Sequence, residues 1–348
     1  MKVFNYFVEP ASYTIDLVHN VYDPNKFDYC FIKSDSLAES DLELNTTYLD
    51  KLSFFKKFKF IYSIHKEKDF IIINGYNNYI FVLTFFLNVF STRKKPIAIE
   101  SDTKLRIPSN FIKRFFKRIY LSFFFRNKYV IGLAGGGKTH KDLFRFYGMN
   151  EDRIILIPMI VNNDKFLNEK TFPNIFTFLY VGRLISTKNV DVLCEKFIKN
   201  FSELNAKLII VGGGKNYNKL TERFNHPKID FKGKVFGNDL LKIYKDSSVF
   251  VFPSTWEQWG LVVNEALSAS LPVIAHSEVG AVHDLIEERG TGFVIDNWVE
   301  LEDKMLELYN NKSLLLKCSE NAKKLMVNKW NYKLYEDNLL EMINRSCN

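Results

Sequence analysis

The sequence predicts an α/β protein with two doubly wound domains, each built on a parallel sheet. Apolar runs of strand length alternate with helical stretches in both halves of the chain, as in a parallel sheet covered by helices. A length of 348 residues gives each half enough chain to form its own core. An irregular segment containing Pro158 and Pro173 lies between the halves, and we interpret it as the interdomain connection.

The expected elements follow from the apolar runs. In the first half, strands are predicted at residues 2–7, 29–32, 70–74, 97–100 and 129–133. In the second half, they are predicted at residues 176–181, 207–211, 230–231, 249–252, 272–275 and 292–295. The predicted boundaries are an N-terminal domain at 1–160, a linker at 161–174, a second domain at 175–328, and a C-terminal helix at 329–348 that packs back toward the first domain.

Composition excludes several classes of protein. Hydrophobic residues make up 47% of the chain and charged residues 25%, which is typical of a globular protein. No apolar stretch reaches the roughly 18 residues that a membrane-spanning helix needs, and the N-terminus lacks the pattern of a signal peptide. The four cysteines are scattered without metal-binding spacing, so we expect free thiols in a reducing, cytoplasmic setting.

The net charge of +8 is confined to the N-terminal half. The first 165 residues hold 25 Lys and Arg against 17 Asp and Glu, whereas the remainder holds 23 of each kind. The excess peaks at residues 104–128, which carry eight basic residues and no acidic one. No zinc finger, helix-turn-helix or RNA-binding signature accompanies this charge, so a nucleic-acid partner is not expected.

A helix from about Asn110 would be amphipathic. Five apolar residues would share one face and four basic residues the other: Ile112, Phe115, Phe116, Ile119 and Phe123 against Lys113, Arg114, Lys117 and Arg118. One interpretation is that the apolar face packs into the core and the basic face lies in solvent. The other is a helix that contacts an anionic membrane surface through these basic residues, with Arg126 and Lys128, and through the aromatic side chains at 123–125.

Three stretches of the second half carry the chemistry. They are LYVGRLISTKNVDVL at 179–193, LIIVGGG at 208–214, and the segment 251–296, in which seven residues separate Glu257 from Glu265. In this order they resemble the nucleotide-sugar domain of retaining glycosyltransferases with the GT-B fold, the glycosyl transferases group 1 family with its E-x7-E motif. The resemblance is strong over residues 175–300, and in the first half it rests only on the alternation of strands and helices. It implies two Rossmann-like domains that face each other across a cleft.

The residue types suit sugar transfer from a nucleoside diphosphate. The leaving diphosphate gains negative charge, and fixed cations that stabilise such charge usually supply the largest catalytic contribution. Arg183 ends a predicted strand and Lys188 follows five residues later, so one loop can direct both toward the phosphates. No two aspartates are separated by a single residue, so we expect these two cations to replace a metal, and we expect no cofactor.

The resemblance assigns the two glutamates. It implies that Glu257 contacts the hydroxyls of the donor sugar and that Glu265 holds both ribose hydroxyls, a role that suits an ionised carboxylate. Gly260 and Leu261 would begin the helix that carries Glu265, where free backbone amides favour phosphate. Gly182, Gly213 and Trp259 complete the predicted donor site. The family often has glycine directly after the first glutamate, whereas Gln258 stands there in this chain, which leaves the identity of the sugar open.

The stretch GLAGGGKTH at 132–140 also matches the phosphate-loop pattern G-x-x-x-x-G-K-[ST] of nucleotide hydrolases. The next apolar strand ends in proline and asparagine, however, and lacks the aspartate that would bind magnesium. The stretch also fits the strand, turn and helix that close the first domain in the GT-B fold. We therefore interpret the match as coincidental and expect Gly135, Gly136 and Gly137 to line the cleft, with a phosphate contact of Lys138 left open.

The acceptor is expected to bind the N-terminal domain. Relatives usually carry a glycine pair after the first strand, and this chain has Glu9, Ser12 and Tyr13 in that loop instead. Asp102 follows a predicted strand, at the sheet edge where ligands bind, and is a candidate to orient or deprotonate the acceptor hydroxyl. A helix cap or a salt bridge with Lys104 or Arg106 is an equally good interpretation of Asp102.

We therefore expect a retaining glycosyltransferase that moves a sugar from a nucleoside-diphosphate donor to a glycan or lipid-linked glycan. The resemblance implies same-face attack, in which the leaving diphosphate helps to take the acceptor proton. The abundance of Phe, Ile, Lys, Asn and Tyr indicates an AT-rich genome, and bacterial surface polysaccharide synthesis at the inner face of the membrane is the expected setting. Two alternatives are a phosphate-loop hydrolase using Lys138 and Thr139, and a non-catalytic scaffold with a GT-B-like fold.

Overall fold

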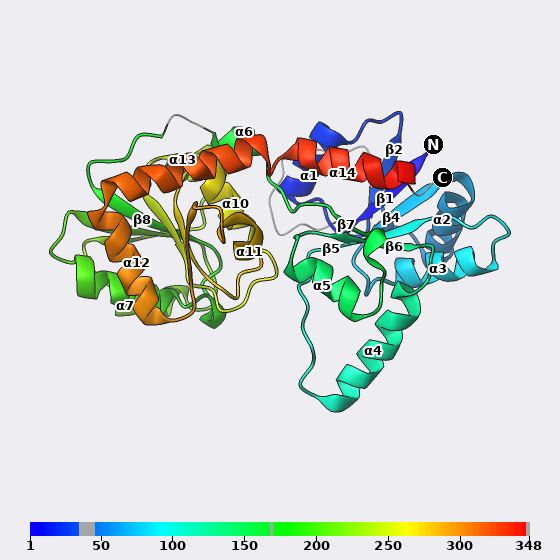
Figure 1. Ribbon diagram of the computed structural model, residues 1–348, viewed down its shortest axis with the longest axis horizontal. Coiled ribbons are helices and arrows are strands. Elements are labelled where there is room, and N and C mark those ends of the chain that lie inside the picture. The colour runs from blue at the N-terminus through cyan, green and yellow to red at the C-terminus, as the bar shows by residue number, and fades with distance from the viewer. Residues whose placement is uncertain (35–45, 168–169, 346–348) are drawn as a thin grey trace. The chain divides into compact units, whose positions relative to one another are not determined.

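The computed structural model describes residues 1–34, 46–167 and 170–345 (Figure 1). The chain divides into two compact units, which are described separately: unit 1 is Met1–Met159 with Tyr332–Asn348, and unit 2 is Ile160–Asn331. Each unit contains one parallel sheet whose strands are joined by helices. Both units are therefore Rossmann-like, as the sequence predicts.

The sheet of unit 1 has seven strands in the described residues, in the order β3-β2-β1-β4-β5-β6-β7. They are β1 (Val3–Phe7), β2 (Phe27–Phe31), β3 (Thr47–Tyr48), β4 (Phe70–Asn74), β5 (Ile97–Ser101), β6 (Val130–Ala134) and β7 (Ile154–Leu156). The chain moves outward from β1 to β3 and then returns to the other side of β1 with β4, so the strand order reverses there. Ligands of open α/β sheets bind beside such a reversal, at the carboxyl ends of the strands.

Six α-helices of unit 1 surround this sheet in the described residues. They are α1 (Ser12–Val21), α2 (Phe54–Glu67), α3 (Tyr79–Phe90), α4 (Phe111–Phe125), α5 (Thr139–Phe146) and α14 (Tyr332–Arg345). The C-terminal helix α14 packs on α1 and β7 of this unit. The hydroxyls of Tyr22 and Tyr335 lie 3.4 Å apart, and Asn338 Nδ2 donates to the Leu156 carbonyl at 2.9 Å.

The sheet of unit 2 has six strands in the order β10-β9-β8-β11-β12-β13, counted over the described residues. They are β8 (Phe176–Val181), β9 (Ala206–Val211), β10 (Ile229–Gly233), β11 (Val249–Phe252), β12 (Val273–His276) and β13 (Gly292–Ile295). Its helices are α6 (Asn163–Phe166), α7 (Val190–Phe201), α8 (Tyr217–Arg223), α9 (Gly237–Lys245), α10 (Leu261–Ser268), α11 (Val282–Leu285), α12 (Trp298–Asn310) and α13 (Lys312–Asn328). The strand order reverses between β8 and β11. The segment interpreted as a linker contributes α6, which packs against α10.

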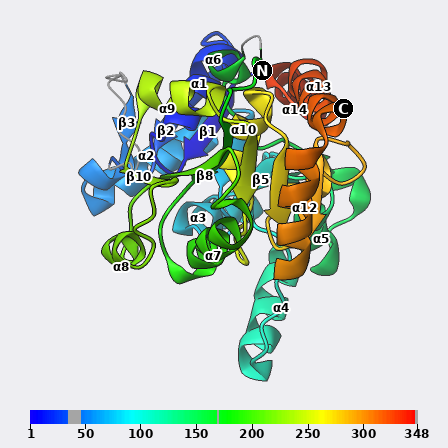
Figure 2. The same ribbon diagram turned by 90° about the vertical axis from the view of Figure 1, so that its left-hand side faces the viewer.

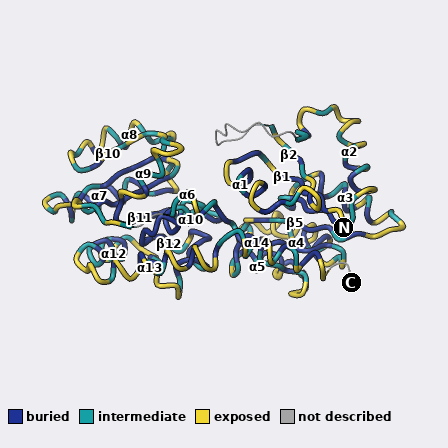
Figure 3. The backbone as a smooth tube through the Cα atoms, turned by 90° about the horizontal axis from the view of Figure 1, so that it is seen from above, coloured by how far each residue is buried: buried dark blue, intermediate teal, exposed yellow. Residues whose placement is uncertain are grey.

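The central strands form the core of each unit. Helices cover both faces of a doubly wound sheet, so its inner strands are apolar at every position rather than at alternate positions. The run from Phe70 to Ile73 in β4 has no exposed surface, and neither has Phe250 in β11. Figure 3 shows the same contrast along the chain, with buried strands and exposed outer turns of the helices. Because this burial holds the strands in place, the loops that follow their carboxyl ends start from fixed positions.

Helix α4 begins where the sequence predicts, after Asn110, whose side chain accepts a hydrogen bond from the Lys113 amide at 3.0 Å. The interpretation of its apolar face as a core face is wrong. Ile112, Phe115, Phe116, Ile119 and Phe123 are 52–64% exposed. Only Leu121, Phe124 and Phe125, near the C-terminal end, are buried. The first turns of α4 project from the body of unit 1 and carry this apolar face with them (Figures 1 and 2).

The segment GLAGGGKT does not form a phosphate loop. Its first glycine, Gly132, lies inside β6 and pairs with Ile99 and Ile154 on the neighbouring strands. A Cβ atom at Gly132 would lie 2.7 Å from the Phe144 ring, so close packing explains this glycine. Only residues 135–138 remain between β6 and α5, too few to wrap a phosphate with the six-residue loop that the motif requires.

Candidate functional site

The predicted donor residues of unit 2 gather at the carboxyl ends of β8, β9 and β11. Gly182, Arg183 and Lys188 follow β8, Gly213 follows β9, and Glu257 lies in the loop between β11 and α10. This is the edge of the sheet at which the strand order reverses, between β8 and β11. The topology therefore places these residues where open α/β sheets bind ligands.

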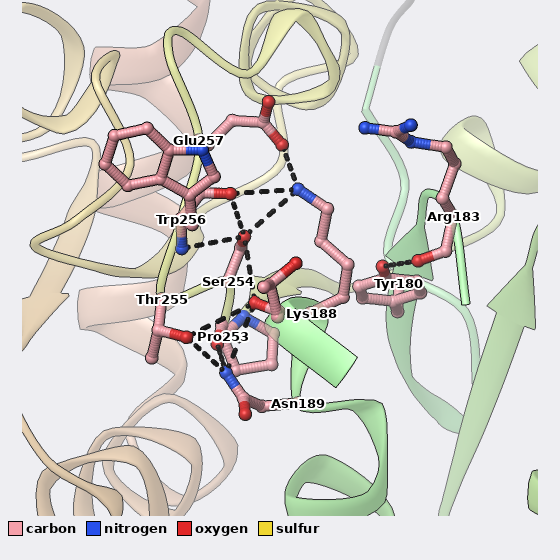
Figure 4. A network of polar contacts seen from close by, with 10 residues as sticks. Tyr180, Arg183, Lys188, Asn189, Pro253, Ser254, Thr255, Trp256 and Glu257 are labelled. Carbon is pink, nitrogen blue, oxygen red and sulfur yellow. Dashed lines mark hydrogen bonds and ion pairs between the residues drawn. The ribbon is translucent and has the colours of Figure 1, made fainter. Parts of the chain in front are cut away.

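Lys188 and Glu257 form an ion pair at this edge (Figure 4). The Lys188 side chain is 4% exposed and that of Glu257 25% exposed. Lys188 Nζ also donates to Ser254 Oγ at 3.1 Å and to the Trp256 carbonyl at 3.2 Å. Because burial of an ammonium is costly unless its donors are satisfied, this set of acceptors holds Lys188 in place. The sequence predicts both charged partners, although not their contact.

Asn189 holds the loop after β8, which carries Lys188, in place. It has left-handed backbone geometry, with φ of 49°, and it begins α7 directly after Lys188. Asparagine tolerates this conformation better than most residues. Its side chain donates to the Pro253 carbonyl and to Thr255 Oγ1, both at 3.0 Å. These bonds tie the loop after β8 to the loop after β11, so Asn189 fixes the position of Lys188 relative to Glu257.

Arg183 lies on the same side of the site. Arg183 is exposed, and its guanidinium makes no ion pair with any described residue. Its backbone carbonyl accepts a hydrogen bond from the buried Tyr180 hydroxyl at 3.1 Å, which fixes the backbone at the strand end. Figure 4 shows the side chain extended toward the Lys188–Glu257 pair without contacting it. An anion can therefore pair with Arg183 without breaking an existing ion pair of this side chain.

Glycines let the loops approach each other closely. At Gly212, directly after β9, φ is 134° and a Cβ atom would lie 1.9 Å from the Gly182 carbonyl oxygen. No other residue fits there, so backbone rather than side chains forms this part of the site. Gly260 has φ of 98° and begins α10, the helix that carries Glu265. Leu261 is the first residue of this helix, which follows β11 in the chain.

Glu265 is held by a residue that the sequence analysis misses. The Tyr244 hydroxyl, on α9, donates to Glu265 Oε2 at 2.7 Å, and Tyr244 has no exposed surface. Burial raises the pKa of Glu265 to about 7, and the hydrogen bond from Tyr244 partly opposes that rise. No local pattern pairs these two residues, because they lie on different helices and meet only in the folded unit.

Trp259 occupies the core rather than the site. Its residue is 2% exposed, its indole stacks on Trp330 with ring centroids 5.6 Å apart, and its Nε1 donates to Asn264 Oδ1 at 2.8 Å. Since the indole N–H is already bonded, the side chain supports the loop that carries Glu257 and Gly260. Its predicted contact with the donor would have to come from its backbone.

A cavity of about 260 Å³ in unit 1 brings together the residues predicted for the acceptor. Glu9, Tyr13 and Asp102 line it, whereas Ser12 does not. The cavity lies beyond the carboxyl ends of β1, β4 and β5, at the reversal of the strand order. Glu100 also lines it and is missing from the prediction, although it stands only two residues before Asp102 in the sequence. Within the described residues, no group of acidic, histidine or cysteine side chains has the arrangement of a metal site.

Fold and site together define a protein of the GT-B class, with two Rossmann-like units and a phosphate-compatible site at the edge of the second sheet. Residues 163–325 match the family model described as Glycosyl transferases group 1. The structure of HepE from Anabaena, determined with UDP and glucose, is similar over 99% of both chains, with a TM-score of 0.73 and 16% sequence identity. At this identity the likeness shows the fold.

Two relatives are similar in sequence over part of their length. The capsular polysaccharide biosynthesis glycosyltransferase CapM of Staphylococcus aureus is 28% identical over 177 residues, which cover 49% of this chain and 46% of CapM. The UDP-Gal:alpha-D-GlcNAc-diphosphoundecaprenol alpha-1,3-galactosyltransferase of Escherichia coli is 31% identical over 199 residues, 51% of each chain. The similarity thus spans about half the length of these relatives.

Proposed function

We propose that the protein is a retaining, metal-independent glycosyltransferase. It moves a sugar from a nucleoside diphosphate, bound at unit 2, to a hydroxyl of a glycan or lipid-linked glycan, bound at unit 1. The observation that carries the proposal is the placement of Arg183 and Lys188 beside Glu257 at the reversal of the second sheet. The match of residues 163–325 to the glycosyltransferase family model supports it, as do the functions named for CapM and for the Escherichia coli galactosyltransferase.

Each group has one task in this mechanism. The bond between the sugar and the diphosphate breaks as the acceptor oxygen bonds to the same carbon, and the acceptor proton passes to a diphosphate oxygen. Arg183 and Lys188 stabilise the charge that builds up on the diphosphate, an effect that preorganised groups provide without reorganisation during the reaction. Lys188 exchanges part of its contact with Glu257 for the phosphate, which releases Glu257 to accept hydrogen bonds from the sugar hydroxyls. Glu265 accepts those of the ribose.

Nucleotide binding provides the direct test. We expect one of UDP, GDP or ADP, or its sugar conjugate, to raise the thermal stability of the full chain. At about 100 times its dissociation constant, a ligand adds about 2.7 kcal/mol to the free energy of unfolding. The Lys138→Ala variant should be stabilised equally, because GLAGGGKT forms no phosphate loop. No stabilisation by any of these nucleotides, or magnesium-dependent release of phosphate from ATP or GTP, would contradict the proposal.

We also propose that unit 1 docks on an anionic bilayer through the exposed face of α4. Seven large hydrophobic side chains of α4 face solvent next to Lys113, Arg114 and Arg118, which are also exposed: Phe111, Ile112, Phe115, Phe116, Ile119, Tyr120 and Phe123. Helix α2 of the same unit has a similar composition, with exposed Phe54 and Phe55 followed by two lysines. Lys117 contributes less, because its Nζ donates to the Arg106 carbonyl at 3.1 Å. None of the described helices is both long and apolar enough to cross a bilayer.

Sedimentation with vesicles tests this docking. Each Lys or Arg near an anionic surface contributes about 1 kcal/mol, so replacing Lys113, Arg114, Lys117 and Arg118 together by glutamine should weaken binding at least tenfold. Binding should require phosphatidylglycerol and should weaken as salt is added, because exposed charges are screened beyond a Debye length. The matched control replaces Lys312, Lys317 and Lys323, which are exposed on α13 of unit 2. Salt-insensitive binding, or none, would refute the docking.

A further inference from the structure

A buried aromatic side chain adjoins the candidate donor site. Phe252 is the last residue of β11 and is 2% exposed. A Cβ atom added at Gly182 or at Gly260 would lie 3.5 Å from a carbon of its ring, so the ring lies beside the glycines of two site loops. It also stacks on the ring of Tyr180, with centroids 5.9 Å apart and an interplanar angle of 26°. These neighbours hold the ring in one position.

The ammonium group of Lys188 lies over the face of this ring. Its Nζ is 5.4 Å from the ring centroid, within the roughly 6 Å over which an aromatic face attracts a cation. The Lys188 side chain is 4% exposed, and a desolvated cation is attracted more strongly than one in water. The contact therefore meets the conditions of a strong cation–π interaction.

This contact differs in kind from the others that Lys188 makes. An ammonium has three N–H donors, and the structure provides three acceptors for them: Glu257, Ser254 Oγ and the Trp256 carbonyl. A diphosphate oxygen can accept a hydrogen bond from this ammonium only if one of these acceptors is released. An aromatic face attracts the cation through its quadrupole and carries no net charge, so Phe252 neither competes with the phosphate nor neutralises the lysine.

We infer that Phe252 is a positioning residue, which holds the Lys188 ammonium in place while it exchanges Glu257 for the donor diphosphate. The inference rests on the proposed glycosyltransferase function and adds a residue to its site. Tyr180 belongs to the same arrangement, because its ring stacks on Phe252 and its hydroxyl donates to the Arg183 carbonyl at 3.1 Å. One aromatic pair thus contacts both residues whose cations the proposed mechanism directs at the leaving diphosphate.

Fluorination of the Phe252 ring tests the contact in the full chain. Fluorine withdraws electrons from the aromatic face and so weakens its attraction for a cation, with only a small change in shape. Phenylalanine with one, two or three ring fluorines is introduced at position 252 by nonsense suppression. Phe178 in β8 receives the same series as the matched control, because it has no exposed surface and packs against other phenylalanine rings.

The first readout is the rate of sugar transfer. We expect kcat to fall stepwise with the number of fluorines at position 252, by about 5–30-fold with three, which corresponds to the strength of a desolvated cation–π contact. The KM for the donor should change less than kcat, because the charge on the diphosphate grows in the transition state. The Phe178 series should keep the wild-type kcat.

The second readout is thermal unfolding, which needs no substrate. The midpoint should fall stepwise with the number of fluorines at position 252, by about 2–8 °C with three. Lys188→Met retains a long side chain without a charge, so in that background the same fluorines should leave no stepwise fall. Comparison of the two backgrounds removes any effect of fluorine on packing that does not involve the cation.

The outcomes separate this inference from the proposed function. A kcat independent of the number of fluorines overturns the inference, as does the same dependence in the Phe178 series or a midpoint trend that persists in Lys188→Met. A graded midpoint without a graded kcat also overturns it and leaves the transferase proposal. If Lys188→Met does not fold, the kcat series decides. If the unmodified chain transfers no sugar from any nucleotide sugar, the proposed function fails, and the midpoint series decides whether Phe252 holds Lys188.

Discussion

Arg183→Ala should lower the rate of sugar transfer by about 10²–10³-fold while leaving the fold intact. Loss of one preorganised group that stabilises developing charge has an effect of this size. The side chain is exposed and makes no ion pair with any described residue, so the free energy of unfolding should change by no more than about 0.5 kcal/mol. Initial rates with the donor identified by the nucleotide screen, together with denaturant unfolding of the same samples, give both numbers.

Lys188→Ala should lower the rate to a similar extent but should also destabilise unit 2. Its Nζ is buried against Glu257, Ser254 and the Trp256 carbonyl, so truncation leaves several acceptors without a donor. The double variant Lys188→Ala/Glu257→Gln removes the unpaired carboxylate and should recover part of the stability without recovering turnover. Lys138→Ala is the matched control, a lysine that also stands between a strand and a helix, and should transfer sugar at the wild-type rate. Near-wild-type turnover in both Arg183→Ala and Lys188→Ala would refute the assigned roles.

The sequence predicts the sheets well because their signal is local. Inner strands of a parallel sheet are apolar at most positions, and this pattern marks β1, β4, β5 and β6 as well as β8, β9, β11 and β12 of unit 2. The family resemblance likewise locates Lys188 and Glu257, which the structure brings into contact although they stand 69 positions apart in the sequence. The two-residue strand β3 is too short to leave any pattern.

Local sequence patterns do not predict contacts between residues that are distant in the chain. The apolar face of α4 has the spacing of a core face, but periodicity does not reveal whether another element covers it, and none of the described elements covers Phe115 or Phe116. Tyr244 and Glu265 lie on separate helices, so no spacing rule links them. Glu100 ends a predicted strand, and no local pattern shows that the fold places this residue in the lining of the unit 1 cavity.

The second large effect is expected at Glu265. If its carboxylate accepts two ribose hydroxyls, Glu265→Ala removes two hydrogen bonds to a charged group, each contributing about 1.5–3 kcal/mol, and should weaken nucleotide binding by about 10²–10⁴-fold. Glu257→Ala should leave the affinity for the free nucleoside diphosphate within about threefold of wild type, because that variant frees Lys188 and removes only a contact to the sugar. Calorimetry with the nucleotide alone separates the two roles. Equal losses in both variants would refute this division.

The pH dependence of donor binding distinguishes a ribose contact from a structural role of Glu265. Burial raises its pKa to about 7, and only the ionised form accepts both hydroxyls, so affinity should increase as pH rises through 7. The Tyr244 hydroxyl lowers that pKa, so Tyr244→Phe should raise it and move the midpoint of the affinity profile to higher pH. The ligand must be a nucleotide sugar, because the terminal phosphate of a free diphosphate itself titrates near pH 6. An affinity profile that is flat between pH 6 and 8.5 in the wild type, or unmoved in Tyr244→Phe, would show that Glu265 does not hold the ribose through its ionised form.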